Sequence, residues 1–442
     1  MNERIDMSIL SKHLPAIHVE HHKNTSESTT VKMPAPDKVY ISMVQHIGPP
    51  CQPTVAVGDT VKVGQKIGDN EAYVSAPIHS GVSGKVLAIE NTVSSVGILD
   101  PTIIISVDKK QEILEDIKPP EVNDKESFLK AVRDSGLVGL GGAAFPTHVK
   151  FNPKNLDEVD TLIINGAECE PYITSDYRTM MEDTELLLNG IRTTMKYLGI
   201  EKAIIAIESN KEPAIKKISG LVKDDHDIEV FTLKSNYPQG AERVIIYETT
   251  GRVVHPGKLP ADSGVIVSNV STMAEIQRYI ETGMPLITRR ITVDGNAIKS
   301  PKNVEVTIGT PINKLIDFCG GYRRVPKKII MGGPMMGRSI FDDGIAIIKN
   351  NNAILAFDEE WAKFPKETAC INCGRCVKAC PMMLMPTSIF KAYDRRDKEA
   401  LEKLKVTLCM ECGSCSYVCP AKKQLSFMNR LAKQLVLEGG KK

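Results

Sequence analysis

The sequence lacks any hydrophobic run approaching the ~18 consecutive apolar residues that a transmembrane helix needs. It also lacks a strong charge of either sign, because 56 basic and 54 acidic residues leave a formal net charge of +2. A protein that holds nucleic acid through phosphate charge carries a basic excess, so no nucleic-acid partner is expected. The N-terminus has no basic-then-apolar signal pattern. We therefore expect a cytoplasmic chain that docks on a membrane partner.

A disulfide framework is not indicated either. Eight of the eleven cysteines fall in two short repeats near the C-terminus of a long chain without a secretion signal. Metal ligation in a reducing compartment explains this usage better than disulfide bonding. The other three cysteines, Cys51, Cys169 and Cys319, are expected to be small buried residues.

The two cysteine repeats, TACINCGRCVKACP and LCMECGSCSYVCP, share the spacing C-x2-C-x2-C-x3-C-P. In two-cluster ferredoxins this spacing gives three thiolates to one [4Fe–4S] cluster and the fourth to its neighbour. Zinc sites more often use two separated C-x-x-C pairs, so iron–sulfur ligation is favoured. The predicted first cluster is held by Cys370, Cys373, Cys376 and Cys419, and the second by Cys409, Cys412, Cys415 and Cys380. Two adjacent clusters would conduct single electrons.

The rest of the chain is too long for one core and divides by pattern. Short strands broken by Gly and Pro give way to alternating helices and strands, which predict a largely parallel sheet. The predicted boundaries are 1–36 for a solvated N-terminal arm with His18, His21 and His22, 37–108 for a β module, 109–125 for a linker, 126–285 for an α/β domain, 286–348 for a β-grasp module, 349–364 for a second linker and 365–442 for the two-cluster domain.

The β module at 37–108 resembles the barrel-sandwich hybrid of biotinyl and lipoyl carrier domains. The resemblance rests on V-x-x-G-D-x-V-x-x-G-Q-x-I-G followed by A-P-x-x-G-x-x-G-x-V. A carrier needs a lysine at the tip of the hairpin before the A-P segment, and GDNEAYVS has none. The fold is therefore expected without the carrier function.

A glycine-rich loop, SGLVGLGGAAFPTHVKF, precedes the first strand of the α/β domain. Closely spaced glycines let backbone N–H groups approach a phosphate, and Lys150 adds a positive charge. The loop is neither a dinucleotide fingerprint nor a P-loop. The strand TLIIN then leads to Asn165 and to GAECEP with Glu168 and Glu170, groups suited to ribityl or ribose hydroxyls.

The same segments resemble the NADH-binding subunit of respiratory complex I. GLVGLGGAAFPTHVKF is similar to its flavin loop G-x-G-G-A-G-F-P-x-x-x-K, NGAECEP to N-A-D-E-x-E-P, SNVSTM to N-N-V-E-T, and YPQGAER stands where that family has C-G-E-E-T. Ala144 and Ala241 depart from the pattern. The resemblance implies FMN binding by Gly139, Gly141, Gly142, Lys150, Asn165, Glu168, Asn269 and Thr272, and NAD(H) near Phe145, Glu170, Gly240 and Glu242.

The order of all parts resembles the RnfC subunit of the Rnf complex, the ion-translocating ferredoxin:NAD+ oxidoreductase of bacterial membranes. The resemblance implies a multidomain α/β and β fold: a barrel-sandwich hybrid, a Rossmann-like flavin domain, a β-grasp (SLBB-like) module and a helical ferredoxin-like domain. It also implies an enzyme subunit that exchanges hydride between NAD(H) and FMN and moves single electrons through two [4Fe–4S] clusters. Its expected partners are integral-membrane and iron–sulfur subunits and, indirectly, ferredoxin, at the cytoplasmic face of the membrane.

Two alternatives remain open at this point. One is a soluble NADH-dependent electron-transfer flavoprotein that serves an amino-acid (proline) reductase. The other is a non-catalytic iron–sulfur relay between partners. The tail PAKKQL after Cys419 and the absence of extra catalytic cysteines favour the Rnf interpretation over the first.

Overall fold

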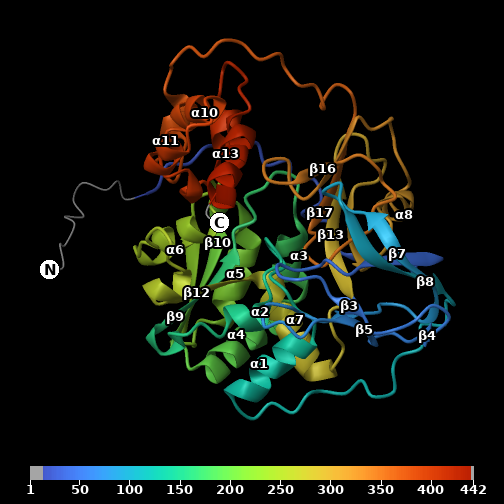
Figure 1. Cartoon of the computed structure of the whole chain (residues 1–442). Helices are drawn as coiled ribbons and strands as arrows, with labels where there is room; N and C mark the ends of the chain where they lie inside the picture. Colours follow the sequence, from blue (N-terminus) through green and yellow to red (C-terminus); the bar gives the residue numbers. More distant parts are fainter. Residues whose placement is uncertain (1–12, 440–442) are drawn as a thin grey trace.

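The computed structural model describes residues 13–439. The parallel-sheet α/β domain lies beside the β-rich parts, and the helical C-terminal domain, red in Figure 1, lies against the α/β domain. Among the described residues, no helix is long and apolar enough to cross a membrane.

The N-terminal β module consists of short antiparallel strands in two sheets, ordered β2-β8-β7-β4 and β3-β5-β6. The strands are β2 (Lys38–Ser42), β3 (Gln52–Pro53), β4 (Thr60–Val61), β5 (Lys66–Asp69), β6 (Ile78–His79), β7 (Gly84–Val93) and β8 (Leu99–Val107). Alternate residues of β2 face a closed apolar core with Ile67 and Ile105, since Val39 and Ile41 are fully buried. Cys51 is buried in the same core, as expected.

The α/β domain has four parallel strands in the order β11-β10-β9-β12. Its strands are β9 (Thr161–Gly166), β10 (Lys202–Glu208), β11 (Ile228–Leu233) and β12 (Val265–Asn269), and its helices are α1 (Lys125–Asp134), α2 (Thr147–Lys150), α3 (Ser175–Glu182), α4 (Thr184–Leu198), α5 (Glu212–Leu221), α6 (Glu242–Thr250) and α7 (Val270–Thr282). The chain runs outward from β9 to β11 and then returns to place β12 on the other side of β9. The strand order therefore reverses between β9 and β12, where doubly wound sheets bind ligands.

The third domain is a six-stranded mixed sheet, ordered β1-β14-β13-β17-β15-β16, with one helix. Its elements are β1 (Val31–Lys32), β13 (Thr288–Asp294), β14 (Lys302–Thr307), α8 (Ile312–Phe318), β15 (Lys328–Met331), β16 (Arg338–Ile340) and β17 (Ala353–Phe357). The expectation of a linker over 349–364 is wrong for β17, which lies inside the sheet between β13 and β15. All five residues of β17 are buried, so its sequence lacks the alternation that marks a half-exposed strand.

The expectation of a solvated N-terminal arm is also wrong for the described part of that segment. Ile17 pairs with Tyr237 of the α/β domain, and Val19 is buried. The Lys23 ammonium donates to the backbone carbonyls of Glu168, Glu170 and Ile173 at 2.6–2.8 Å. Further along, β1 extends the sheet of the third domain. The arm therefore ties the α/β domain to the β-grasp domain.

The C-terminal domain is built from short helices: α9 (Arg375–Lys378), α10 (Pro386–Asp394), α11 (Lys398–Lys403), α12 (Ser414–Tyr417) and α13 (Leu425–Gly439). Gly374 and Gly413 precede α9 and α12 with φ of 73° and 83°, a left-handed conformation that glycine adopts without steric cost. Each of these glycines follows the second cysteine of its repeat. The two repeats thus fold alike, and α13 packs across α10 and α12 (Figure 1).

Candidate functional site

The reversal point of the parallel sheet carries two of the predicted residues. Asn165 is in register with Asn269, which closes β12, so the two side chains leave the carboxyl edge of neighbouring strands. Both strands are short apolar runs that the domain core buries, and each reaches its polar residue only at this edge. This edge is where the strand order of the domain leads one to look for a ligand.

The glycine-rich loop is held against the N-terminus of α7. Asn269 caps α7 by accepting a hydrogen bond from Ser271 N at 2.8 Å, and its Nδ2 donates to Asp176 at 2.7 Å. A Cβ added to Gly141 would lie 2.6 Å from that Nδ2, so the loop backbone needs glycine there. Thr272 Oγ1 accepts from Leu140 N at 3.2 Å. Glycine-rich backbone at the start of a 13-residue helix fits the phosphate end of FMN.

Other predicted flavin and nicotinamide residues meet beside this loop. Asn165 Nδ2 donates to Gly240 O at 2.8 Å, and a Cβ on Gly240 would lie 2.5 Å from Ala167 O. Lys150 Nζ forms a 2.8 Å ion pair with Glu242. Phe145 closes the loop through its backbone oxygen, which accepts from Gly139 N at 2.9 Å. The residues assigned separately to FMN and to NAD(H) are therefore neighbours, whereas Gly142 has no atom within 4 Å of its Cβ position.

Glu168 lies beneath the site rather than open to it. Its carboxylate accepts from Asp176 N at 2.7 Å and Tyr177 N at 3.4 Å, at the start of α3. The residue is 5% exposed, and burial raises the pKa of its carboxyl group. Lys23 and Lys211 both donate to its backbone oxygen. Glu168 thus fixes the loop after β9 by its carboxylate and its carbonyl at once.

Glu170 reaches a different domain. Its carboxylate accepts from Met335 N at 3.0 Å and Met336 N at 2.8 Å, in the loop between β15 and β16. Burial raises the pKa of Glu170 to about 7 against the opposing effect of these two donors. A Cβ on Gly333 would lie 2.3 Å from the Glu170 carboxylate, so the two segments fit closely. The structure places Glu170 at a domain contact, and its part in NAD(H) binding stays a prediction.

The eight repeat cysteines line two cavities in the C-terminal domain. Cys370, Cys373, Cys376 and Cys419 line one, and Cys380, Cys409, Cys412 and Cys415 line the other. Each cavity thus takes its fourth thiol from the other repeat. In residues 13–439, no group of three or more His, Cys, Asp or Glu side chains could hold a single metal ion. Four thiols spread around a cavity fit the corners of a [4Fe–4S] cluster.

The two cavities differ in their surroundings. Cys412 O accepts a 2.6 Å hydrogen bond from the hydroxyl of Tyr237, a residue of the α/β domain that is 1% exposed. Met335 O lies 3.0 Å from a Cβ position on Gly413, so the β15–β16 loop also contacts this repeat. Cys370 and Cys373, in contrast, are exposed. The Cys412 cavity adjoins the α/β domain, and the Cys370 cavity reaches solvent.

Several residues of this region were not found from the sequence. Tyr237, Lys23, Lys211 and Asp176 make contacts that depend on segments far apart in the chain. Buried Lys211 pairs with Glu208 at 2.8 Å, and the one signal for this was the i, i+3 spacing of opposite charges after a strand. Nothing in the sequence near Lys23 pointed to three backbone carbonyls more than 140 residues away.

Comparison with protein families accounts for most of the chain. Residues 14–110 match the RnfC barrel-sandwich hybrid domain, 132–278 the Nuo51 FMN-binding domain, 290–339 the SLBB domain and 363–420 the 4Fe–4S dicluster domain. These matches define the class: an electron-transfer flavoprotein with an FMN-binding domain and a domain for two 4Fe–4S clusters.

Full-length relatives narrow the class to a family. The chain is 43% identical to the C component of the Na(+)-translocating ferredoxin:NAD(+) oxidoreductase complex of Acetobacterium woodii, over 82% of both chains. It is 44% identical to the C component of the proton-translocating complex of Clostridium ljungdahlii, over 84% of this chain and 82% of the relative. It is 37% identical to the C component of the ion-translocating oxidoreductase complex of Rhodobacter capsulatus, over 88% and 76%. The chain belongs to this family, the RnfC subunits of the Rnf complexes.

The predicted family, fold class, electron-transfer role, FMN and 4Fe–4S clusters are thereby confirmed. The individual ligands and the domain boundaries stay predictions.

Proposed function

We propose that this chain is the subunit at which a membrane-bound ferredoxin:NAD+ oxidoreductase exchanges hydride with NAD(H). FMN supplies the conversion between two-electron and one-electron transfer, which neither a nicotinamide nor a cubane can perform alone. The chain would sit peripherally at the cytoplasmic face of the membrane. Its partners would be integral-membrane and iron–sulfur subunits, with ferredoxin reached indirectly through them. The relatives from Acetobacterium, Clostridium and Rhodobacter are named as subunits of such complexes, which favours this role over a soluble flavoprotein for an amino-acid reductase.

The observation that carries the proposal is the convergence of three separate segments at the reversal point of the sheet. The glycine loop, the residue that ends β9 and the N-terminus of α7 meet through the contacts of Gly141 and Thr272. The loop amides and α7 would hold the FMN phosphate, while Asn165 and Lys150 border the remainder of the site. The Lys150–Glu242 ion pair links the flavin side to the nicotinamide side, so binding of either ligand would affect the other.

The contacts also support an order for the two clusters. The cluster held by Cys380, Cys409, Cys412 and Cys415 would be the inner one, because Tyr237 joins Cys412 to the α/β domain. The cluster held by Cys370, Cys373, Cys376 and Cys419 would be the outer one, because two of its thiols are exposed. Single electrons would then pass between the flavin site and another subunit through the inner cluster first.

The test is to reconstitute the purified chain with iron, sulfide and FMN and to add NADH anaerobically. Bleaching of the flavin absorbance followed by a [4Fe–4S] EPR signal is the expected result. A matched pair of variants locates the site: Lys150→Ala should weaken FMN retention, whereas Lys154→Ala, which changes a nearby exposed lysine, should not. If NADH reduces neither flavin nor clusters while both are bound, the chain is a relay and the proposal is wrong.

A further inference from the structure

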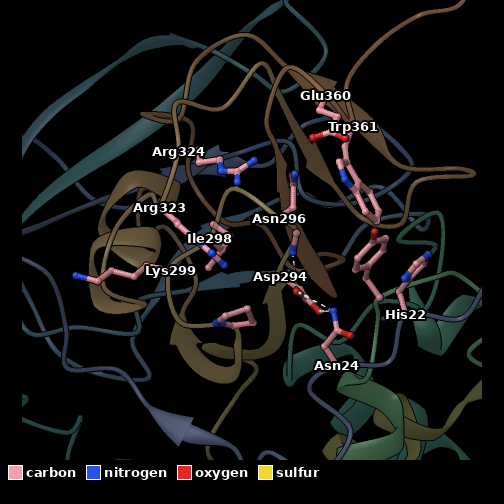
Figure 2. A pocket seen from close by; sticks show the side chains of 13 residues that line it. His22, Asn24, Asp294, Asn296, Ile298, Lys299, Arg323, Arg324, Glu360 and Trp361 are labelled. Atoms are coloured by element: carbon pink, nitrogen blue, oxygen red, sulfur yellow. Dashed lines mark hydrogen bonds between the residues drawn. The ribbon is translucent and has the colours of Figure 1, made fainter.

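A second cleft lies away from the flavin site, at the outer end of the β-grasp domain. It has a volume of about 560 Å³, within the range of small-molecule sites. Its walls come from the N-terminal segment, the turn after β13, the loop before β15 and the segment after β17. Figure 2 shows Arg323 and Arg324 on one side, Trp361 and His22 on the other, and Asp294 and Asn296 between them.

One wall of this cleft is aromatic. Trp361 is 52% exposed, and Phe357 lies parallel to it on the protein side, with ring centroids 6.4 Å apart and an interplanar angle of 2°. His22 stacks on Tyr172 at 4.8 Å and meets Trp361 edge-on at 5.6 Å. The indole is thus supported from behind and beside. Its exposed part offers a flat surface on which a planar ring can stack.

The opposite wall is basic. Arg324 pairs with Asp358 at 2.7 Å, which holds its guanidinium in place. Among residues 13–439, no hydrogen bond or ion pair engages the side chains of Arg323 or Lys299, and both are exposed. Arginine presents a planar fork of donors that matches phosphate oxygens. This wall therefore carries uncommitted donors for an anionic group.

The floor supplies acceptors. Asp294 is 1% exposed, and its carboxylate accepts from Gly295 N at 2.7 Å and from Asn24 Nδ2 at 3.2 and 3.4 Å. Burial raises the pKa of Asp294 to about 6. A carboxylate has about four acceptor positions, so these two donors leave capacity for a hydroxyl or amino group. A stacking ring, an anion site and a hydroxyl acceptor thus share one cleft.

We propose that this cleft binds a nucleotide, with its base on Trp361, its phosphate on Arg323 and Lys299, and a sugar hydroxyl or ring amine on Asp294. The site is separate from the flavin site, so it would sense a nucleotide without using it as an electron carrier. It also joins the N-terminal segment to the β-grasp domain, because His22 and Asn24 contribute to it. Occupancy would therefore tighten a contact between two domains.

The chain offers a specific probe, because Trp361 is its single tryptophan. The FMN-loaded protein is titrated with AMP, and tryptophan emission is excited at wavelengths where adenine does not absorb. A saturable change of emission is expected with AMP. Adenosine, which lacks the phosphate, and inorganic phosphate, which lacks the ring, should each bind at least about tenfold more weakly. Equilibrium dialysis with labelled AMP measures the same affinities independently.

Variants separate this cleft from the flavin site. Arg323→Ala with Lys299→Ala should weaken AMP binding about tenfold or more, while Lys85→Ala with Lys216→Ala removes equal charge elsewhere and should not. Flavin reduction by NADH should be unchanged in both. No saturable emission change with AMP, or equal AMP affinity in the two double variants, would overturn the proposal. If AMP binding falls only when flavin-site residues are changed, the nucleotide binds there and the cleft merely anchors the N-terminal segment.

Discussion

Replacing Gly141 by alanine tests the flavin loop with a single methyl group. The added Cβ would lie 2.6 Å from Asn269 Nδ2, 2.9 Å from its Cγ and 3.1 Å from its Cβ, so either Asn269 or the loop must move. Moving Asn269 breaks its cap on α7, worth about 1 kcal/mol, and its bond to Asp176, worth about 2 kcal/mol. The loop is anchored there by the bond from Leu140 N to Thr272, worth about 1 kcal/mol. The cheaper response is therefore a displaced loop.

A displaced loop should show in FMN affinity rather than in stability. We expect the dissociation constant of FMN to rise about tenfold or more, equivalent to at least about 1.4 kcal/mol, with a small change in melting temperature. The assay is quenching of flavin fluorescence as the apoprotein is titrated into FMN. Gly142→Ala is the matched control, because nothing lies within 4 Å of its Cβ position. Equal FMN affinity in the two variants would refute the assigned loop geometry.

Contacts outside the loop lead to three more predictions. Cys380→Ser should abolish the cluster built with Cys409, Cys412 and Cys415 and spare the other, while Cys419→Ser should do the reverse; EPR of the reduced protein distinguishes them, and loss of the same cluster in both would contradict the shared arrangement. Tyr237→Phe removes the bond to Cys412 O and should slow the reduction of clusters by NADH without slowing flavin reduction, measured by stopped flow; a parallel slowing of both would place Tyr237 at the flavin step instead. Buried Lys349 donates to Pro77 O and Gly136 O, and burial lowers its pKa to about 7 from 10.5, so the unfolded chain binds more protons between these values and its contribution to stability should rise as pH rises from about 7 to about 9. Melting temperatures should then show a smaller rise with pH in Lys349→Met than in the wild type, and identical pH profiles would contradict the assignment.

The parts that the sequence predicted well are those in which local spacing determines the structure. The cysteine repeats led to the same grouping of thiols that lines the two cavities, because short loops of fixed length leave little freedom. The α/β alternation was equally legible, since strands such as β9 and β12 are apolar runs ending in a polar residue. By contrast, β17 is buried throughout and carries no alternation that separates it from a linker, and β1 owes its strand conformation to pairing with β14.

The side chains of the site were harder to predict than its backbone. Glu168 and Glu170 stand two residues apart, and the motif alone suggested one ligand-facing role for both. In the structure Glu168 turns toward α3 and Glu170 toward the loop between β15 and β16. Their directions depend on Lys23, which fixes the intervening carbonyls from a segment with no recognisable motif. Such long-range contacts leave no periodic signal in a single sequence.

These contacts explain why the domains of this chain would have to stay in fixed relation. An electron crosses between two centres at a rate that falls steeply with their separation, so a flexible link between flavin and cluster would interrupt the path. The chain between β17 and α9 has no helix or strand over residues 363–374 and cannot itself fix the distance. The fixing is done by Tyr237 on Cys412 and by Glu170 on the β15–β16 loop, whose Met335 in turn contacts Gly413. Loosening the Glu170 contact should therefore impair transfer to the clusters even though Glu170 touches neither of them.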